Sequence, residues 1–390
     1  MRILHVAESV KGGCGTYLNQ VVASQLSDPA IHDLHVVVPD EHIVQVPDIP
    51  TAKRSLFASR GRSPASLLAL WRATDQAVRE FKPDCVHLHS TFAGAVGRIG
   101  LMLRAQRPPI VYCAHGWAFD MAGSIAKQRC VARVERWLSR RCEGVIAISD
   151  YERARGIEVG IAPERIVTVP NGIGDAPPPP PPECSPIRRV LFVGRLDRQK
   201  GVDVLLQAMR DLGGRVDLRV IGASVVGDEA PVLDQPGVTA LGWCDQDRIC
   251  RELAWADCVV VPSRWEGFGL VAVEAMRAGR AVVASDVGGL AQVVEHGRTG
   301  WLVPPEDPVA LAMALVAPSD ADLRAAGVAG RQRFLRHFTI DRTVTALRAV
   351  YRQAIAMRSS INHAFAHEFG EVGMAPLGAR AERLPRMSSL

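Results

Sequence analysis

The 390-residue sequence has no pair of cysteines at the C-x-x-C spacing, and its nine cysteines form an odd number. Cys85, Cys113 and Cys258 each lie within an apolar stretch, where a reduced thiol packs as a small hydrophobic side chain. Structural disulfides belong mainly to secreted proteins, so this cysteine usage predicts a cytoplasmic protein.

Long apolar runs and a large excess of charge are absent as well. No stretch of about 18 uncharged apolar residues, the length that crosses a bilayer, occurs in the sequence. The opening residues Met-Arg-Ile-Leu-His-Val are typical of a strand and not of a secretion signal. The formal net charge of +5 permits anionic partners without requiring nucleic acid. We therefore expect no nucleic-acid partner, and any contact with a membrane is expected to be peripheral.

The chain contains enough apolar material for two domains, because 48% of its 390 residues are hydrophobic. Residues 177–182 are an unbroken proline run, which favours a stiff polyproline spacer. We predict a first domain at residues 1–176, a linker at 177–187 and a second domain at 188–336. Residues 359–390 lack periodicity and are predicted to be a loose tail.

Short apolar strands alternate with helical stretches in both halves. Strands are predicted at residues 2–8, 34–39, 85–89, 110–114, 145–149, 190–193, 218–222, 239–242, 258–261 and 281–285, with another near 166. Helices are predicted at 16–26, 64–81, 127–142, 202–211, 247–255 and 340–357 and from 270, 308 and 320, and a hairpin-like turn at 294–304. This α/β alternation predicts doubly wound parallel sheets, with sites beyond the carboxyl ends of the strands.

A glycine-rich turn follows the first predicted strand. Gly13 and Gly15 form a G-x-G element next to Gly12, but the third glycine of a dinucleotide fingerprint would fall at Leu18. The spacing therefore disfavours an NAD site, although the strand, turn and helix still open a nucleotide-binding type of fold.

The most informative stretch is residues 261–276, in which a strand, a turn with two glycines and a helix follow one another. The first amides of a helix lack internal partners, so this turn predicts an anion cradle that Gly267 and Gly269 open to a phosphate. If the helix begins near Leu270, Glu274 lies about one turn inside it, where a ribose would sit beside the phosphates. Glu266 lies in the turn itself.

The second domain opens with Gly194-Arg195-Leu-Asp-Arg-Gln-Lys200-Gly201 after its first strand. Arg195 and Lys200 stand at the carboxyl end of that strand and the start of the next helix. Two fixed cations at this place are suited to hold a pyrophosphate.

The segment from Glu266 through Gly267-Phe268-Gly269-Leu270 to Glu274 resembles the retaining glycosyltransferases of family 4, in which two glutamates are separated by seven residues. The resemblance is specific from residue 190 to 304 and thinner in the first half. It implies the GT-B architecture, two Rossmann-like domains facing a central cleft, with a last helix, predicted at 337–358, that returns to the first domain.

The resemblance also implies the chemistry: transfer of a sugar from a UDP- or GDP-sugar with retention of configuration, and no cofactor or metal. It assigns donor binding to Arg195, Lys200, Gly267, Phe268, Gly269, Leu270 and Glu274, and a first-domain cleft loop to Gly12 and Gly13. His115, which follows a predicted strand, matches the position of a histidine that reaches the transferred sugar, and Glu266 is its catalytic partner. The roles of His87 and His89 stay open.

The implied acceptor is a lipid-linked or growing saccharide of cell-surface polysaccharide or lipopolysaccharide assembly. Two basic segments could hold such an enzyme on the inner face of the cytoplasmic membrane. The stronger candidate is a loop at residues 53–62, which carries Lys53, Arg54, Arg60 and Arg62. The other is the basic helix at 127–142, for which a solvated outer helix is an equal alternative.

Three alternatives are weighed against this interpretation. Asp245 and Asp247 form a D-x-D pattern, but they precede a helix and are better explained as its cap than as a metal site. A nucleotide-sugar epimerase or a glycosyl phosphorylase would share the architecture. The epimerase would need additional acidic and histidine residues and the phosphorylase a pyridoxal-binding lysine, and neither is located in the sequence. A non-catalytic sugar-nucleotide binding protein would tolerate loss of Arg195, Lys200 or Glu266, and all three are intact.

Overall fold

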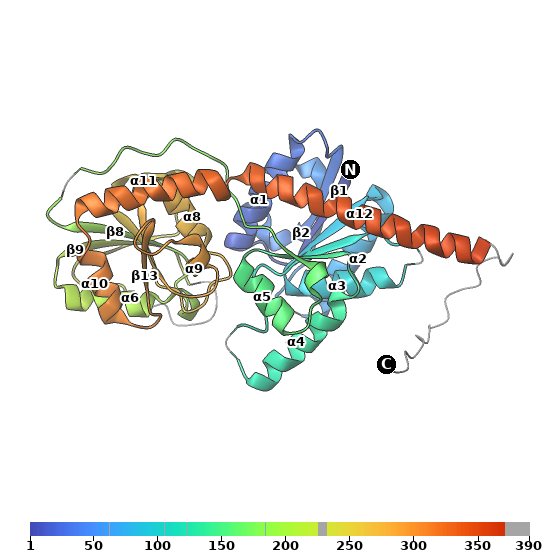
Figure 1. The fold of residues 1–390 in the computed structure, drawn as a ribbon, viewed down its shortest axis with the longest axis horizontal. Helices are drawn as coiled ribbons and strands as arrows, with labels where there is room; N and C mark the ends of the chain where they lie inside the picture. Colours follow the sequence, from blue (N-terminus) through green and yellow to red (C-terminus); the bar gives the residue numbers. More distant parts are fainter. Residues whose placement is uncertain (62, 105, 122, 184, 225–231, 371–390) are drawn as a thin grey trace.

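The computed structural model describes residues 1–370 except 62, 105, 122, 184 and 225–231. It has two α/β units, each built on a parallel sheet with helices on both faces (Figure 1). The fold class predicted from the sequence is therefore confirmed. None of the helices in the described part of the chain combines the length and apolarity that a bilayer crossing requires.

The first unit is a seven-stranded sheet in the order β3-β2-β1-β4-β5-β6-β7. Its elements are β1 (Arg2–Ala7), α1 (Gly13–Leu26), β2 (Asp33–Pro39), β3 (Arg54–Phe57), α2 (Pro64–Phe81), β4 (Cys85–His89), α3 (Thr91–Met102), β5 (Ile110–Cys113), α4 (Ile125–Ser139), β6 (Gly144–Ala147), α5 (Asp150–Glu158) and β7 (Ile166–Thr168). The strand order reverses between β1 and β4, so their carboxyl ends form a switch point.

The second unit is a six-stranded sheet in the order β10-β9-β8-β11-β12-β13. Its elements are β8 (Arg188–Val193), α6 (Val202–Leu212), β9 (Val216–Ile221), β10 (Val238–Gly242), α7 (Gln246–Trp255), β11 (Cys258–Val261), α8 (Leu270–Arg277), β12 (Ala281–Ser285), α9 (Leu290–Val293), β13 (Gly300–Val303), α10 (Pro308–Val316) and α11 (Asp320–His337). Here the order reverses between β8 and β11, the strands that precede the two predicted phosphate loops.

Helix α12 (Ile340–Gly370) follows α11 along one edge of the molecule and crosses the first unit (Figure 1). The crossing is anchored in the core, because the hydroxyl of Tyr351 on α12 lies 2.8 Å from His87 Nδ1 and 3.3 Å from Gln25 Nε2. The return of the last helix is thus as expected. The helix is longer than predicted, and residues 359–370 of the expected loose tail are helical, while 371–390 lie outside the described residues.

Helix α3 was not among the predicted helices, and its sequence contains Gly94, Gly97 and Gly100 although glycine disfavours helices. The structure supplies the reason for these glycines. A Cβ would approach Tyr112 to 2.2 Å at Gly94, Leu88 to 2.6 Å at Gly97, and Trp71 to 2.3 Å at Gly100. Close packing of α3 on its neighbours therefore requires the glycines and overrides their low helix propensity.

Three further expectations need correction. Helix α1 begins at Gly13 and not near residue 16, because Gly12 with φ 66° serves as its N-cap. The segment at 294–304 does contain a tight turn, in which the Gly297 amide donates to the Gly300 carbonyl at 2.8 Å, but the strand that follows, β13, pairs in parallel with β12 and not across the turn. The segment at 53–62, expected to be a loop, contains the edge strand β3, which is parallel to β2.

The proline run at 177–182 contains no helix or strand. It is tied to the second unit, because Arg280 Nη2 donates to the carbonyl of Pro180 at 2.7 Å. The linker therefore follows the second unit at this point and is not a free spacer.

Candidate active site

The two loops at the switch point of the second sheet bring the predicted donor residues together. Lys200 ends a short 3-10 turn after β8, and its Nζ donates to Glu266 Oε2 on the loop after β11. Ser263 Oγ also lies 3.4 Å from this oxygen. A single carboxylate thus joins the predicted diphosphate cation to the predicted catalytic loop.

Arg195 is held within its own loop. Its Nε lies 3.1 Å from Asp197 Oδ2, and its Nη2 donates to Gln199 Oε1 at 2.6 Å. Gln199 Nε2 in turn donates to the carbonyl of Trp265 at 3.1 Å, which links this loop to the one that carries Glu266. Both predicted cations are therefore oriented by carboxylate partners at the carboxyl ends of adjacent strands.

Helix α8 begins at Leu270, as predicted, with Gly269 as its N-cap at φ 98°. Glycine is required there, because the φ is left-handed and a Cβ would lie 2.4 Å from Leu290 Cδ2. The Phe268 ring is buried against Phe338 at a centroid distance of 5.7 Å, which leaves its backbone as the part available to a ligand.

Glu274 lies on α8 one turn after the N-cap and is partly exposed. Loss of hydration raises the pKa of its carboxyl group, and the charge of Arg277 acts in the opposite direction. A partly dehydrated carboxylate of this kind is stabilised by hydrogen bonds from hydroxyl donors such as those of a ribose.

On the first unit, His115 follows β5 in a left-handed conformation with φ 54°. Its Nε2 lies 3.0 Å from His89 Nδ1, and the ring of Tyr17 packs edge-on at 4.7 Å. Loss of hydration lowers the pKa of His115 to about 4, so the imidazole is neutral at pH 7. A neutral ring can accept one hydrogen bond and donate another.

The two units meet at the site. A Cβ on Gly267 would lie 3.5 Å from the Cα of Gly116, the residue after His115, and a Cβ on Gly13 would lie 3.6 Å from Leu270 Cδ1. Farther along, Gln292 Oε1 accepts from the amide of Asp150 at 2.8 Å. The predicted cleft loop and the two predicted catalytic loops therefore border the same space between the sheets.

Glu152 is a site residue that sequence reasoning missed. It is 1% exposed, its Oε2 accepts from the Ile148 amide at 3.0 Å, and no hydrogen-bond partner for its Oε1 is found among the described residues. A Cβ on Gly267 would lie 2.8 Å from that Oε1. Burial raises the pKa of Glu152 to about 8, with a smaller contribution from the charge of Glu266.

The sequence did hold a signal for Glu152. Ser149 and Glu152 have the S-x-x-E spacing of a capping box, and Ser149 Oγ does accept from the Glu152 amide at 3.1 Å. That pattern would have predicted only a helix cap. It could not have indicated that the carboxyl group faces the other unit.

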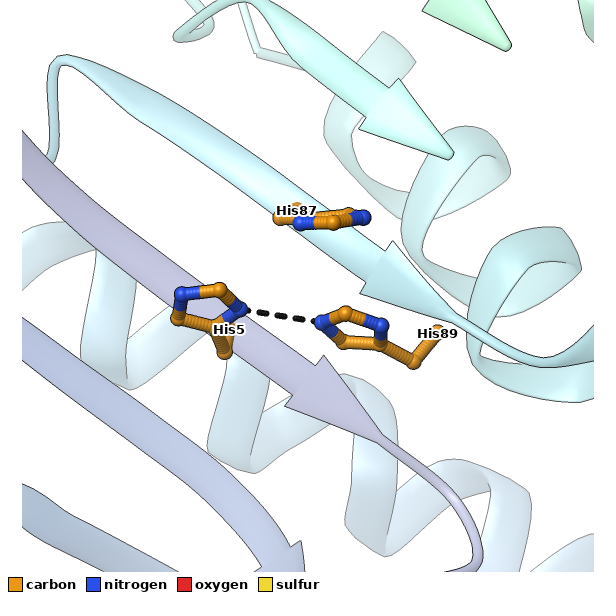
Figure 2. A group of neighbouring side chains, drawn as sticks. All are labelled: His5, His87 and His89. Atoms are coloured by element: carbon orange, nitrogen blue, oxygen red, sulfur yellow. Dashed lines mark hydrogen bonds between the residues drawn. The ribbon is translucent and has the colours of Figure 1, made fainter. Parts of the chain in front are cut away.

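Two places in the described residues bear on metal binding, and one of them was considered from the sequence. Asp245 caps α7, because its Oδ1 accepts from the Arg248 amide at 2.8 Å, so the capping interpretation of the D-x-D pattern is confirmed. Within the described residues, ligand atoms close enough to hold an ion come from His5, His87 and His89, which are fully buried in the first sheet (Figure 2).

In the basic segment at 53–62, two of the predicted membrane cations have polar partners. Lys53 Nζ lies 2.5 Å from Asp33 Oδ1, Arg54 donates to Thr51 at 3.0 Å, and Phe57 is buried. Arg60 is exposed, and Arg62 lies outside the described residues.

Both halves of the chain match known protein families. Residues 11–176 match the family described as Glycosyltransferase Family 4, and residues 187–318 match the family described as Glycosyl transferases group 1. An uncharacterized 41.2 kDa protein in the cps region of Klebsiella pneumoniae is 32% identical over 320 residues, which cover 79% of this chain and 87% of the relative.

A second relative is the phosphatidyl-myo-inositol mannosyltransferase of Mycolicibacterium smegmatis, 30% identical over 343 residues, which cover 83% of this chain and 85% of the relative. Among solved structures, Anabaena HepE in complex with UDP and glucose aligns with a TM-score of 0.73 at 22% identity, over 89% of this chain and 98% of that one. Since the matches cover both halves, the chain belongs to the family-4 glycosyltransferases of GT-B architecture, enzymes that move a sugar from a nucleotide sugar to a saccharide acceptor.

Proposed function

We propose that the enzyme transfers the sugar with retention of anomeric configuration and without a catalytic metal. The observation that carries this proposal is the linked set of Arg195, Lys200 and Glu266 at one switch point, facing the loop of His115. Breaking the bond between sugar and phosphate leaves negative charge on a diphosphate. Two fixed cations and the first amides of α8 can neutralise that charge without Mg²⁺.

Each of the predicted site residues that follow has a role in this mechanism. Arg195 and Lys200 bind the diphosphate, Glu274 accepts from the ribose hydroxyls, and His115 contacts a hydroxyl of the transferred sugar. Glu266, released from Lys200 when the diphosphate binds, holds another hydroxyl beside the anomeric carbon. The bond from that carbon to the phosphate oxygen breaks, the bond to the acceptor oxygen forms on the same face, and the acceptor proton passes to the leaving diphosphate.

The test begins with a panel of UDP-, GDP- and ADP-sugars, with release of the nucleotide and formation of product measured separately. Arg195→Ala and Lys200→Ala are expected to lower turnover by about 10²-fold or more, as loss of an oxyanion donor does. Arg198→Ala is the matched control, since this exposed arginine lies between them in the chain. Turnover that survives in Arg195→Ala would remove it from the donor site.

The stereochemistry has its own measurement. Proton NMR of the isolated product gives the anomeric configuration, and an inverted linkage would reject the front-face mechanism. Release of a changed sugar nucleotide without an acceptor would indicate an epimerase, and tight nucleotide binding without turnover on any donor would indicate a binding protein.

For the acceptor, we propose a saccharide carried by a lipid at an anionic membrane surface. Helix α4 projects from the first unit (Figure 1) and exposes Ile125 and Trp137, which are 66% and 44% accessible. Its exposed cations, with the two that follow it, are Lys127, Arg129, Arg133, Arg136, Arg140 and Arg141. The acidic residue of α4, Glu135, is buried in an ion pair with Arg98 and does not oppose them.

This surface replaces the segment at 53–62 as the proposed membrane contact. Exposed apolar side chains and unopposed cations on one helix suit the boundary between headgroups and acyl chains, and each cation near an anionic surface contributes ~1 kcal/mol. The mannosyltransferase relative, whose name specifies a phosphatidyl-inositol substrate, supports a lipid acceptor for this chain. Such an enzyme would work on the cytoplasmic face of the membrane.

Vesicle sedimentation distinguishes the two surfaces. Binding to phosphatidylglycerol vesicles should fall in Arg133→Glu combined with Trp137→Ser, and should persist in Arg54→Glu combined with Arg60→Glu. Binding that is lost in Arg54→Glu combined with Arg60→Glu and persists in Arg133→Glu combined with Trp137→Ser would assign the membrane contact to the segment at 53–62. No binding by the wild type would reject a membrane contact through either.

A further inference from the structure

A chain of hydrogen bonds runs from the core of the first unit to His115. Gln25 Oε1 on α1 lies 2.8 Å from His5 Nε2, and His5 Nδ1 lies 2.9 Å from His89 Nε2. His89 Nδ1 then lies 3.0 Å from His115 Nε2. Figure 2 shows the central link, with His5 on β1 and His89 on β4.

The sheet register explains why the rings meet. His5 and His87 are directly paired across β1 and β4, and His89 follows two residues later, so all three face the same side of the sheet. That side is covered by α1 and α12, which supply Gln25 and Tyr351. All three rings are completely buried.

Burial keeps the chain uncharged. It lowers the pKa of His5 and of His115 to about 4, and it lowers the pKa of His89 well below its usual value. A neutral imidazole has one N–H donor and one lone-pair acceptor. If one nitrogen of a ring donates a hydrogen bond, the other nitrogen must therefore accept one, and this fixes the donor on the next ring.

The amide of Gln25 sets that direction. Its Nε2 donates to the Tyr351 hydroxyl at 3.3 Å, which leaves Oε1, a pure acceptor, facing His5. His5 must then carry its proton on Nε2 and accept at Nδ1 from His89. His89 carries its proton on Nε2 and accepts at Nδ1 from His115, so the proton of His115 is also on Nε2.

We propose that Gln25, His5 and His89 form a relay that holds His115 in the Nε2-protonated tautomer, with Nδ1 as the nitrogen left to accept a hydrogen bond. The contact of Nδ1 with a donor hydroxyl rests on the proposed function, whereas the tautomer itself does not. Gln25, His5 and His89 are positioning residues, because they act on the sugar only through His115.

Metal binding is the competing use of these rings. In the part of the chain that the structure describes, His87 Nε2 has no hydrogen-bond partner, and the three histidines could surround an ion (Figure 2). However, His5 Nδ1 and His89 Nε2 already face one another as acceptor and donor. An ion would break that bond and place positive charge at residues with no exposed surface.

The first experiment is NMR of the full-length protein labelled with ¹⁵N-histidine, without donor, at pH 7.5. Two-bond nitrogen-proton correlations distinguish Nε2–H from Nδ1–H tautomers, and a His115→Gln variant assigns the signal. We expect the Nε2–H form at His115. The Nδ1–H form, an even mixture, or a stoichiometric metal in the purified protein by elemental analysis would each overturn the proposal.

Two variants of one buried position link the tautomer to catalysis. Gln25→Glu keeps an acceptor opposite His5 and should retain the His115 tautomer, whereas Gln25→Met, of similar volume, should yield a mixture. In Gln25→Met, kcat should fall by about 2- to 10-fold, the effect of one hydrogen bond, with unchanged affinity for the bare nucleotide. A His115 spectrum unaltered in Gln25→Met would refute the relay.

These readouts separate the two proposals. If Gln25→Met alters the His115 tautomer but His115→Gln retains full turnover, the relay stands and the sugar contact fails. If His115→Gln loses turnover but the tautomer is Nδ1–H, the sugar contact stands and the relay fails. If Gln25→Met does not fold, the wild-type spectrum still determines the tautomer of His115.

Discussion

Replacing Glu152 with glutamine should change how the stability of the enzyme depends on pH. The carboxyl group is 1% exposed, and burial raises its pKa from 4.5 to about 8. It is therefore protonated in the folded enzyme at pH 7 and adds no negative charge beside Glu266. In the unfolded chain the same group is ionised above its ordinary pKa.

The sign and size follow from this difference in proton binding. Because the folded state binds the proton more tightly, the contribution of Glu152 to stability is fully present below pH 4.5 and is lost as the pH rises through 8. Each pKa unit corresponds to ~1.4 kcal/mol, so the loss across this window is as much as about 5 kcal/mol. Glutamine cannot ionise, so Glu152→Gln should lack this loss.

The assay is thermal and urea unfolding of both proteins between pH 5 and pH 8.5. The quantity compared at each pH is the difference in free energy of unfolding between the variant and the wild type. The variant should gain stability relative to the wild type as the pH rises. Glu158→Gln is the control, because this glutamate is on the same helix α5 with 67% side-chain exposure. Parallel curves for Glu152→Gln and wild type would show that Glu152 is ionised in the folded enzyme and would refute the reasoning.

Three further predictions concern the donor, the core and metal. Glu274→Ala should weaken binding of the free nucleoside diphosphate, and equal affinity by calorimetry would contradict the ribose role. Glu135→Ala should destabilise the first unit by about 3–5 kcal/mol in urea unfolding, because it leaves the fully buried Arg98 without its partner; a change below ~1 kcal/mol would mean that water replaces the carboxylate. Turnover should survive EDTA, and complete loss that Mg²⁺ restores would reject a metal-free reaction.

The buried strands were the part of the fold that the sequence predicted best. The bounds predicted for β4, β11 and β12 are those of the structure, and these strands are buried along their whole length. Central strands of a parallel sheet are covered on both faces, so their sequences are mostly apolar, as in β11 and β12, and β4 departs from this only at its two buried histidines. The edge strand β3 has no such run: Phe57 is buried and Leu56 is 49% exposed, and the basic residues around them led to its interpretation as a loop.

The donor half of the site was predictable because its residues are close in the chain and carry a motif. The histidine relay was not, because His5, Gln25, His89 and His115 come from different elements and become neighbours only through strand order and register. A single histidine after a strand is compatible with many roles. Only the distances show that His115 is the outer end of a connected set.

The reason inferred from the sequence for a glycine at residue 267 was incomplete. Gly267 was expected because a phosphate must approach the backbone, yet in the structure a Cβ there would also lie 2.8 Å from the buried Glu152 Oε1 of the other unit. The same position thus also matters for the contact between the two units. A side chain at residue 267 would force Glu152 or the loop of Gly116 to move, and His115 precedes Gly116 directly. Glycine at 267 therefore lets the loop of Glu266 lie close to the loop of His115.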